Sequence, residues 1–234
     1  MSTTTRTGAL ALGTAGLLAA AGCGAGAEEA VPATDADGLA TQACALAIEA
    51  SATPVDQWQG FIGDETQAEV LMVAGASGML GATTQAPLPG YEDLLEDATS
   101  VHQGISRIDT EMMTEGLDGL VAACEERGLP DGEVDVAEES RVAYACALVT
   151  AVSDDGRSAE EWLTIGPDAP DEDAVVMAQV GGFSGVMGGM NGHMVPGHDE
   201  LSRAAEGAVR GLMTIHTEEL DESVDAGAAY CATL

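Results

Sequence analysis

The sequence predicts an all-α protein built from two tandem, internally repeated, disulfide-closed helical bundles of about four helices each. Three observations support this prediction: the residue composition, a self-match of the chain, and the symmetric placement of four cysteines. Apolar residues make up 46% of the chain, whereas aromatic residues make up only 3%. The core must therefore consist mainly of Ala, Val, Leu, Ile and Met side chains, and this mixture suits closely packed helices.

The internal repeat appears when the chain is aligned with itself. The segment around Cys44 matches the segment around Cys146 at an offset of 102 residues, and Cys124 matches Cys231 at an offset of 107. The two copies therefore differ by a five-residue insertion in their first loops. So many matches at offsets between 102 and 107 residues indicate a duplicated structural unit. Other matched pairs are Trp58 with Trp162, Ser77 with Ser184, Gly78 with Gly185, Pro89 with Pro196, Gly104 with Gly211 and Ile108 with Ile215.

Apolar residues in both copies recur at intervals of three and four, the period of a helix that faces a core. Examples are Leu94, Ala98, Val101 and Ile105 in the first copy and Leu201, Ala205, Ala208 and Leu212 in the second. We expect helices near 38–51, 65–81, 91–109 and 114–127, and again near 134–153, 171–189, 197–213 and 216–232. The last two helices of each copy can also form one long helix, because no proline separates them.

The cysteines outside the N-terminal segment form an even set of four: Cys44, Cys124, Cys146 and Cys231. Four cysteines allow three connectivities. The pairing of Cys44 with Cys124 and of Cys146 with Cys231 is the one that lies within each copy and is also symmetric. The alternative of a metal site or a redox pair lacks C-x-x-C spacing.

The N-terminal segment has the features of an export signal. Arg6 and the terminal amine precede an apolar stretch from Gly8 to Ala21, which is too short for a stable membrane span. Small residues then precede Cys23, and this ending resembles the lipobox of bacterial lipoproteins. The resemblance covers residues 1–23 only; it implies cleavage before Cys23 and attachment of a diacylglycerol to its sulfur. An ordinary signal peptide in which Cys23 is incidental is the alternative.

These features predict a division of the chain into five parts. We expect a lipoprotein signal, a flexible tether, a first helical unit, a short Gly- and Pro-containing linker and a second helical unit. The expected ranges are 1–23, 24–36, 37–128, 129–133 and 134–234.

The charge of the chain excludes several classes of partner. Forty Asp and Glu residues face seven Arg and no Lys, which gives a net charge of -33. Such a surface repels phosphate backbones, and it gives no polybasic attraction to an anionic bilayer. We therefore expect no nucleic-acid binding, and we interpret the acidity as a solvated surface that keeps the protein soluble.

Two Gly-rich segments and two tryptophans invite a functional interpretation. The segments 74–78 and 181–185 contain Ser77 and Ser184, but they match neither a phosphate-binding loop nor a nucleophile elbow. Their duplication favours a packing role in which small residues let two helices approach closely. Trp58 and Trp162, also duplicated, are expected to fill the core, with a binding anchor as the alternative.

One cluster in the second copy has no counterpart in the first. It consists of Met190, His193, Met194 and His198, and thioether and imidazole groups are suitable ligands for Cu(I). The alternative is that these methionines are flexible core filler, as Met187 is expected to be.

From these patterns we expect a non-catalytic, lipid-anchored protein at the extracytoplasmic face of the cell membrane. Its body would be an interaction or binding module for an envelope protein or a small ligand, without a cofactor. The alternative is an extracytoplasmic copper-binding protein that uses the Met/His cluster of the second unit. An enzyme is disfavoured because no His or Ser constellation with catalytic spacing stands out in the sequence.

Overall fold

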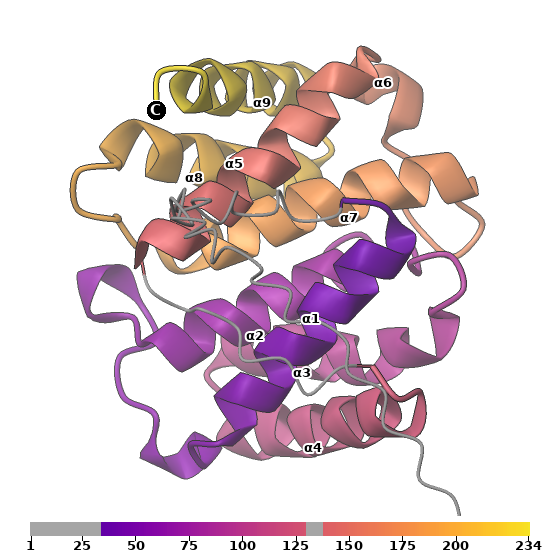
Figure 1. Ribbon diagram of the computed structural model, residues 1–234, viewed down its shortest axis with the longest axis vertical. Coiled ribbons are helices and arrows are strands. Elements are labelled where there is room, and N and C mark those ends of the chain that lie inside the picture. Colours follow the sequence, from indigo (N-terminus) through magenta and orange to yellow (C-terminus); the bar gives the residue numbers. More distant parts are fainter. Residues whose placement is uncertain (1–33, 130–137) are drawn as a thin grey trace, which may run out of the picture. The chain divides into compact units, whose positions relative to one another are not determined.

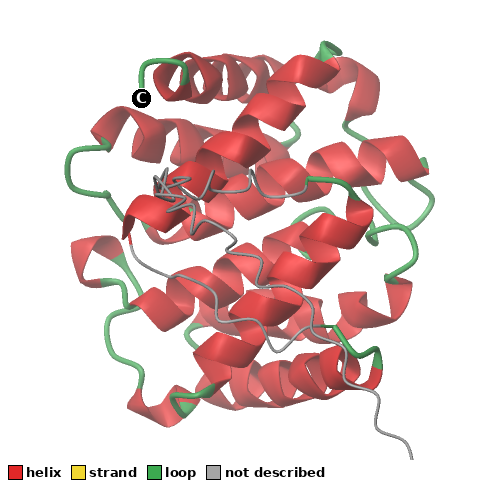
Figure 2. Cartoon of the chain, in the orientation of Figure 1, coloured by secondary structure: helices red, strands yellow, loops and turns green. Residues whose placement is uncertain are grey.

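The computed structural model describes residues 34–129 and 138–234, and the regular structure in these two ranges is helical, with no strand (Figure 2). The all-α prediction is therefore confirmed. The chain from Val31 to Leu234 forms one compact unit. No helix in the described ranges has both the length and the apolar character needed to cross a bilayer. The predicted signal 1–23 with Cys23, nearly all of the tether 24–36 and most of the linker 129–133 lie outside the described residues.

Within residues 34–129 and 138–234, each half contains four long helices, as the apolar periodicity predicts (Figure 1). The elements of the first half are α1 (Ala36–Ser51), η1 (Val55–Gln57), η2 (Gly63–Glu65), α2 (Ala68–Met79), η3 (Glu92–Leu94), α3 (Leu95–Arg107) and α4 (Thr110–Glu126). The elements of the second half are α5 (Glu138–Asp155), α6 (Ala159–Trp162), α7 (Asp171–Val186), η4 (Gly189–Asn191), α8 (Asp199–Thr214) and α9 (Thr217–Cys231). The short helix α6 was not predicted, although Ser158 and Glu161 form a capping box at its start.

The last two helices of each half are separate, which settles the alternative that the sequence left open. Ile108 directly follows α3 and Ile215 directly follows α8, and both residues adopt the left-handed conformation, with φ of 53° and 56°. The following residue, Asp109 or His216, donates its backbone N–H to the carbonyl five residues earlier and caps the next helix with its side chain. Two isoleucines thus occupy a helix-terminating position that normally favours glycine.

The two halves meet where α2 packs against α7 (Figure 1). A Cβ atom on Gly78 would lie 2.2 Å from the carbonyl oxygen of Gly181, and one on Gly185 would lie 2.4 Å from the carbonyl oxygen of Ala74. In the repeat, Gly78 corresponds to Gly185 and Ala74 corresponds to Gly181. The contact of Gly78 with Gly181 is therefore equivalent to the contact of Gly185 with Ala74. In the same way, the close approach of Gly75 to the Val186 side chain is equivalent to that of Gly182 to the Met79 side chain. The interface is therefore self-complementary, as in a twofold dimer, and the predicted packing role of the Gly-rich segments is confirmed.

The largest side chains fill the core on either side of this interface. Trp58 is 5% exposed and Trp162 is 1% exposed, which confirms that both tryptophans belong to the core. Met187 is fully buried, as expected for a core methionine. At the junction itself, the hydroxyl of Tyr144 in α5 lies 3.4 Å from the sulfur of Met79 in α2. The two halves consequently share one apolar interior.

Candidate functional site

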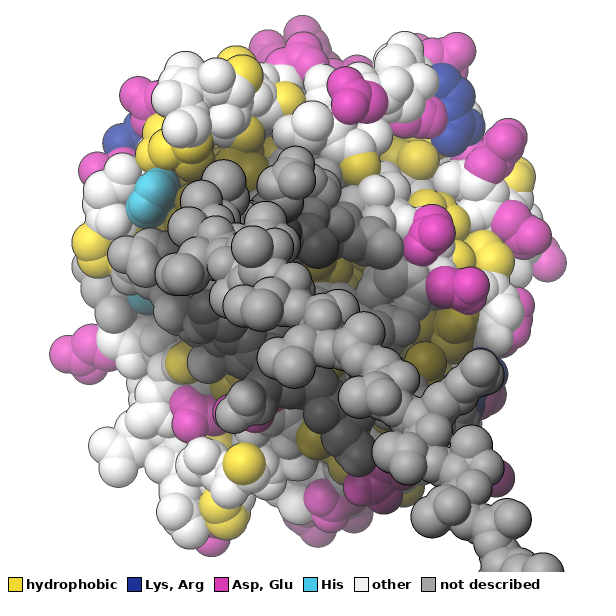
Figure 3. All heavy atoms as spheres, in the orientation of Figure 1, with side chains coloured by type: hydrophobic (Ala, Val, Ile, Leu, Met, Phe, Trp, Pro, Cys, Tyr) yellow, Lys and Arg dark blue, Asp and Glu magenta, His cyan; other side chains and the backbone are white. Residues whose placement is uncertain are grey.

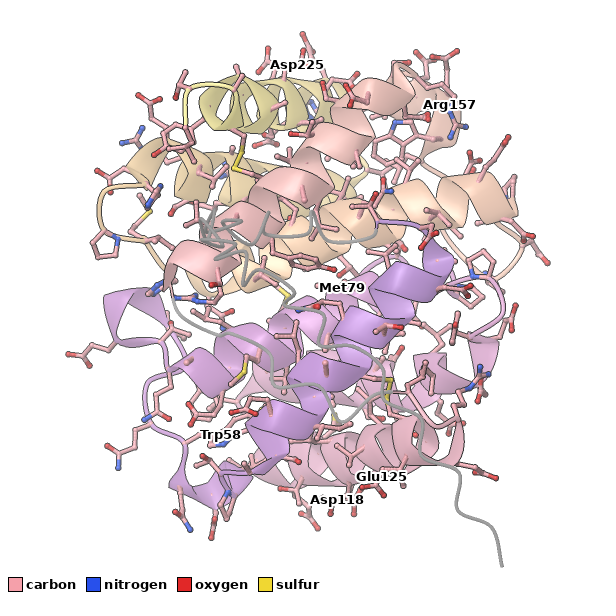
Figure 4. All side chains as sticks on the ribbon, viewed as in Figure 1. Trp58, Met79, Asp118, Glu125, Arg157 and Asp225 are labelled. Atoms are coloured by element: carbon pink, nitrogen blue, oxygen red, sulfur yellow. A yellow bond between two sulfur atoms is a disulfide. The ribbon has the colours of Figure 1, made fainter. Side chains whose placement is uncertain are left out.

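Two disulfides close the halves and hold the scaffold on which any site is built. Cys44 of α1 is bonded to Cys124 of α4, and Cys146 of α5 is bonded to Cys231 of α9, as the yellow bonds in Figure 4 show. The predicted connectivity is confirmed. The bridges span sequence separations of 80 and 85 residues. Closing loops of this length stabilises each half by about 4 kcal/mol through the lost entropy of the unfolded chain.

A cavity with a volume of about 490 Å³ lies at the junction of the halves. The first half contributes Thr66, Ala68 and Leu71 from the start of α2 and the loop before it. The second half contributes residues of α5, of the loop between η4 and α8, and of the first turn of α8: Arg141, His193, Met194, Pro196 and Asp199. The lining thus combines apolar walls with a guanidinium, an imidazole and a carboxylate, the mixture found in sites for small polar molecules.

The loop that carries His193 is held against the first half by hydrogen bonds. Gly188 and Gly192, with φ of 72° and 65°, turn the backbone tightly on both sides of η4. The side-chain amide of Asn191 donates to the carbonyl of Phe61 at 2.7 Å. The Nδ1 atom of His193 lies 3.3 Å from the carbonyl of Gly63. These contacts fix the imidazole at the rim between the two halves.

The structure brings together two of the four residues of the predicted copper site. His193 and Met194 line the junction cavity, whereas Met190 packs against the apolar core. The Nδ1 atom of His198 is 2.9 Å from the hydroxyl of Tyr230, and the two rings meet edge to face. Within the described ranges, no three His, Cys, Asp or Glu residues are grouped so that they could hold a metal ion.

The other polar residues of the cavity were missed by sequence reasoning. Thr66, Arg141 and Asp199 come from three segments that are far apart in the chain. None of them belongs to a local motif, because a helix-initiating aspartate and a single arginine occur in many surface helices. Only the packing of α2 against α7 brings them to one cavity.

Carboxylates are numerous on the protein surface, and several arginines are engaged in ion pairs with them. Acidic side chains are scattered over the face drawn in Figure 3. Arg127 pairs with Asp93, lies over the ring of Tyr91, and holds the pKa of the Asp93 carboxyl below its usual value. Arg157 bridges Asp155 and Asp173 at 2.7 and 2.6 Å. These cations stabilise the local fold by offsetting nearby carboxylates.

Comparison of the chain with protein families, with curated proteins and with solved structures found no match.

Proposed function

We propose that this protein is a lipid-anchored binding protein of the extracytoplasmic face of the cell membrane, with a non-catalytic helical body. The observation that carries the proposal is the pairing of all four cysteines of the body into two disulfides, one in each half. Such bridges form and persist in oxidising compartments outside the cytoplasm. An exported chain is therefore the natural context for this body.

The fifth cysteine of the sequence supports the anchor. Cys23 is in neither bridge, and it follows the small residues that resemble a lipobox. An odd cysteine in an exported protein calls for a separate role, and thioether lipidation supplies one. More than one acyl chain would retain the protein at the membrane, because each buried methylene contributes about 0.8 kcal/mol.

The anchor is tested by Cys23→Ser in cells fed with a labelled fatty acid. We expect the wild type to carry the label and to sediment with membranes, whereas the variant loses the label and leaves the membrane fraction. The matched control is the double variant Cys44→Ser, Cys124→Ser, which also removes sulfur atoms but should keep the label. Retention of an unlabelled wild-type protein at the membrane would refute lipid anchoring.

The binding role is supported by the junction cavity, which both halves build from polar and apolar groups. Ala68 is exposed at its rim, so Ala68→Trp should obstruct the cavity without disturbing the core. We expect a partner or ligand recovered from the cell envelope with the wild type to be lost with this variant. Exposed Glu111 lies outside the lining, and Glu111→Gln is the control that should retain it. Equal recovery with both variants would place the binding elsewhere on the protein or remove it.

Copper binding by the second half is the other candidate function. Its support is that His193 and Met194, both suitable ligands for Cu(I), line the same cavity. Calorimetric titration with Cu(I) should then show tight binding that disappears in the double variant His193→Ala, Met194→Ala. Equal, weak binding by both proteins would end this candidate and leave the lipid-anchored binding module intact.

A further inference from the structure

The second half contains another cavity, with a volume of about 320 Å³, at the end of the protein where Arg157 and Asp225 are labelled in Figure 4. One wall is the turn 156–158 that follows α5, and another is the face of α9 that carries Asp221, Val224 and Asp225. Trp162, at the end of α6, also lines this cavity. A volume of this size is at the low end for ligand sites, and it has room for a small molecule.

The indole of Trp162 differs from its counterpart in the first half. Trp58 donates its indole N–H to the backbone carbonyl of Thr53, five residues earlier, at 2.8 Å. Trp162 is 1% exposed, and its indole N–H makes no hydrogen bond to a described residue. The indole nitrogen is not one of the buried atoms that lack a partner, so water reaches it. Arg157 occupies the repeat position of Thr53, and both Arg157 and Trp162 line the cavity. The indole ring is buried while its N–H is open to water, so a ligand in the cavity can accept a hydrogen bond from this donor.

Two carboxylates on one face of α9 line the same cavity. Asp221 and Asp225 are four residues apart, and therefore neighbours on the helix surface. One oxygen of Asp221 accepts from the backbone N–H of Ala159 at 2.7 Å, and Asp225 is exposed. Arg157 is engaged by Asp155 and Asp173. In the first half the counterpart of Asp221 is Thr114, so this pair of carboxylates is specific to the second half.

We propose that this cavity binds a small organic cation, namely a protonated amine that also carries a hydroxyl or carbonyl oxygen. The ammonium group is held by the carboxylates of Asp221 and Asp225, and the oxygen accepts the indole N–H of Trp162. The net charge of -33 raises the concentration of cations around the protein. An inorganic ion would leave the indole donor unused, whereas an amine with an acceptor oxygen satisfies both groups.

This ligand class gives the proposed binding module a specific occupant, but its test does not depend on the lipid anchor. The chain has two tryptophans, so a ¹⁵N-labelled protein shows two indole N–H signals by NMR, and Trp58→Phe assigns them. The probe is ethanolamine, with ethylamine and ethylene glycol as the amine-only and oxygen-only controls. A ligand of so few heavy atoms binds no tighter than tens of micromolar, so the titration extends to about 50 mM.

We expect ethanolamine to shift the Trp162 signal saturably while the Trp58 signal stays in place. Asp225→Asn should weaken binding about tenfold, because it removes a charge-assisted contact. Asp118→Asn, the same position of the repeat in the first half (Figure 4), should leave the affinity unchanged. Both variants should keep the Trp58 signal, which reports that the fold is intact.

Several results would overturn the proposal. They are the absence of a saturable shift of the Trp162 signal, equal shifts of both indole signals, equal binding of ethylene glycol, or unchanged affinity in Asp225→Asn. With any of these results, the cavity would not be a specific site for an amine with an acceptor oxygen. The indole N–H would then be satisfied by water, and cations would associate only with the acidic surface in general. The membrane-fraction experiment on Cys23 would be unaffected by any of them.

Discussion

The contact between α2 and α7 makes a quantitative prediction about Gly78→Ala. The added methyl carbon would lie 2.2 Å from the carbonyl oxygen and 2.4 Å from the carbonyl carbon of Gly181. These are backbone atoms of a helix, so they cannot rotate aside as a side chain would. The two helices must instead move apart by about 1 Å, and a gap of this size forfeits a quarter to a half of each dispersion contact along the interface.

The expected cost follows from two opposing terms. Overpacking of a close contact costs about 1–3 kcal/mol or more, and the rigid backbone places Gly78→Ala at the upper end of this range. Replacing glycine by alanine within a helix returns about 1 kcal/mol. We therefore expect a net loss of about 2 kcal/mol in the free energy of unfolding and, for a chain of this length, a melting temperature lower by about 4–8 °C.

Urea denaturation followed by circular dichroism measures this effect, and Gly119→Ala is the matched control. Gly119 lies within α4, and the atoms nearest to a methyl group there are those of the Asp97 carboxylate, a side-chain end that can move. The control should be neutral or about 0.5–1 kcal/mol more stable than the wild type. If Gly78→Ala were as stable as Gly119→Ala, the glycines would not be required for the close approach of the halves.

The self-complementary interface adds a second test. A methyl group on Gly185 meets the backbone of Ala74 in the same way, so Gly185→Ala separates the same two helices. Once the helices have moved apart for one methyl group, the second costs little more. We expect the double variant to be less destabilised than the sum of the single variants by at least about 0.5 kcal/mol. Strict additivity would mean that the two contacts are relieved independently.

Two further predictions concern the strained helix ends and the arginine bridges. Ile215→Gly should stabilise the protein by about 0.5–1 kcal/mol, because glycine adopts the left-handed conformation without strain. Ile62 is similarly exposed but has an extended backbone, so Ile62→Gly should not stabilise the protein. Equal effects of the two substitutions in chemical denaturation would contradict this reasoning. Arg157→Gln should destabilise the protein by about 1–3 kcal/mol, because the carboxylate of its partner Asp173 is buried. Arg210→Gln, which removes an exposed ion pair, should cost under about 0.5 kcal/mol. Similar melting temperatures of the two variants would argue against a structural role for the Arg157 bridge.

The breaks between helices show where local sequence signals are sufficient and where they are ambiguous. Apolar periodicity locates the long helices of both halves to within a few residues. It leaves open whether α3 and α4 are continuous, because Ile108 is a poor signal for a helix end. The break depends on the packing of α3 against α4, and this packing holds Ile108 in a conformation that its own side chain disfavours.

The candidate sites depend still more on the tertiary structure. The sequence singles out His193 and Met194 through the unusual density of Met and His in one loop. It does not indicate Thr66, Arg141 or Asp199, which reach the same cavity from distant segments. The sequence also does not indicate that the indole N–H of Trp162 lacks the backbone hydrogen bond that Trp58 makes, because both residues are tryptophan.

By itself, the sequence predicted the helical class and, from the symmetric placement of four cysteines, their pairing, and the structure confirms both. Apolar period and cysteine spacing are local or one-dimensional properties, and so is the repeat spacing that predicts a duplication. Only the tertiary structure decided how the two copies join. Glycines that look like possible ligand loops became the close contact between α2 and α7, since the absence of side chains matters only when another backbone arrives opposite them. The junction cavity follows from that contact, because it brings residues of both halves to one place.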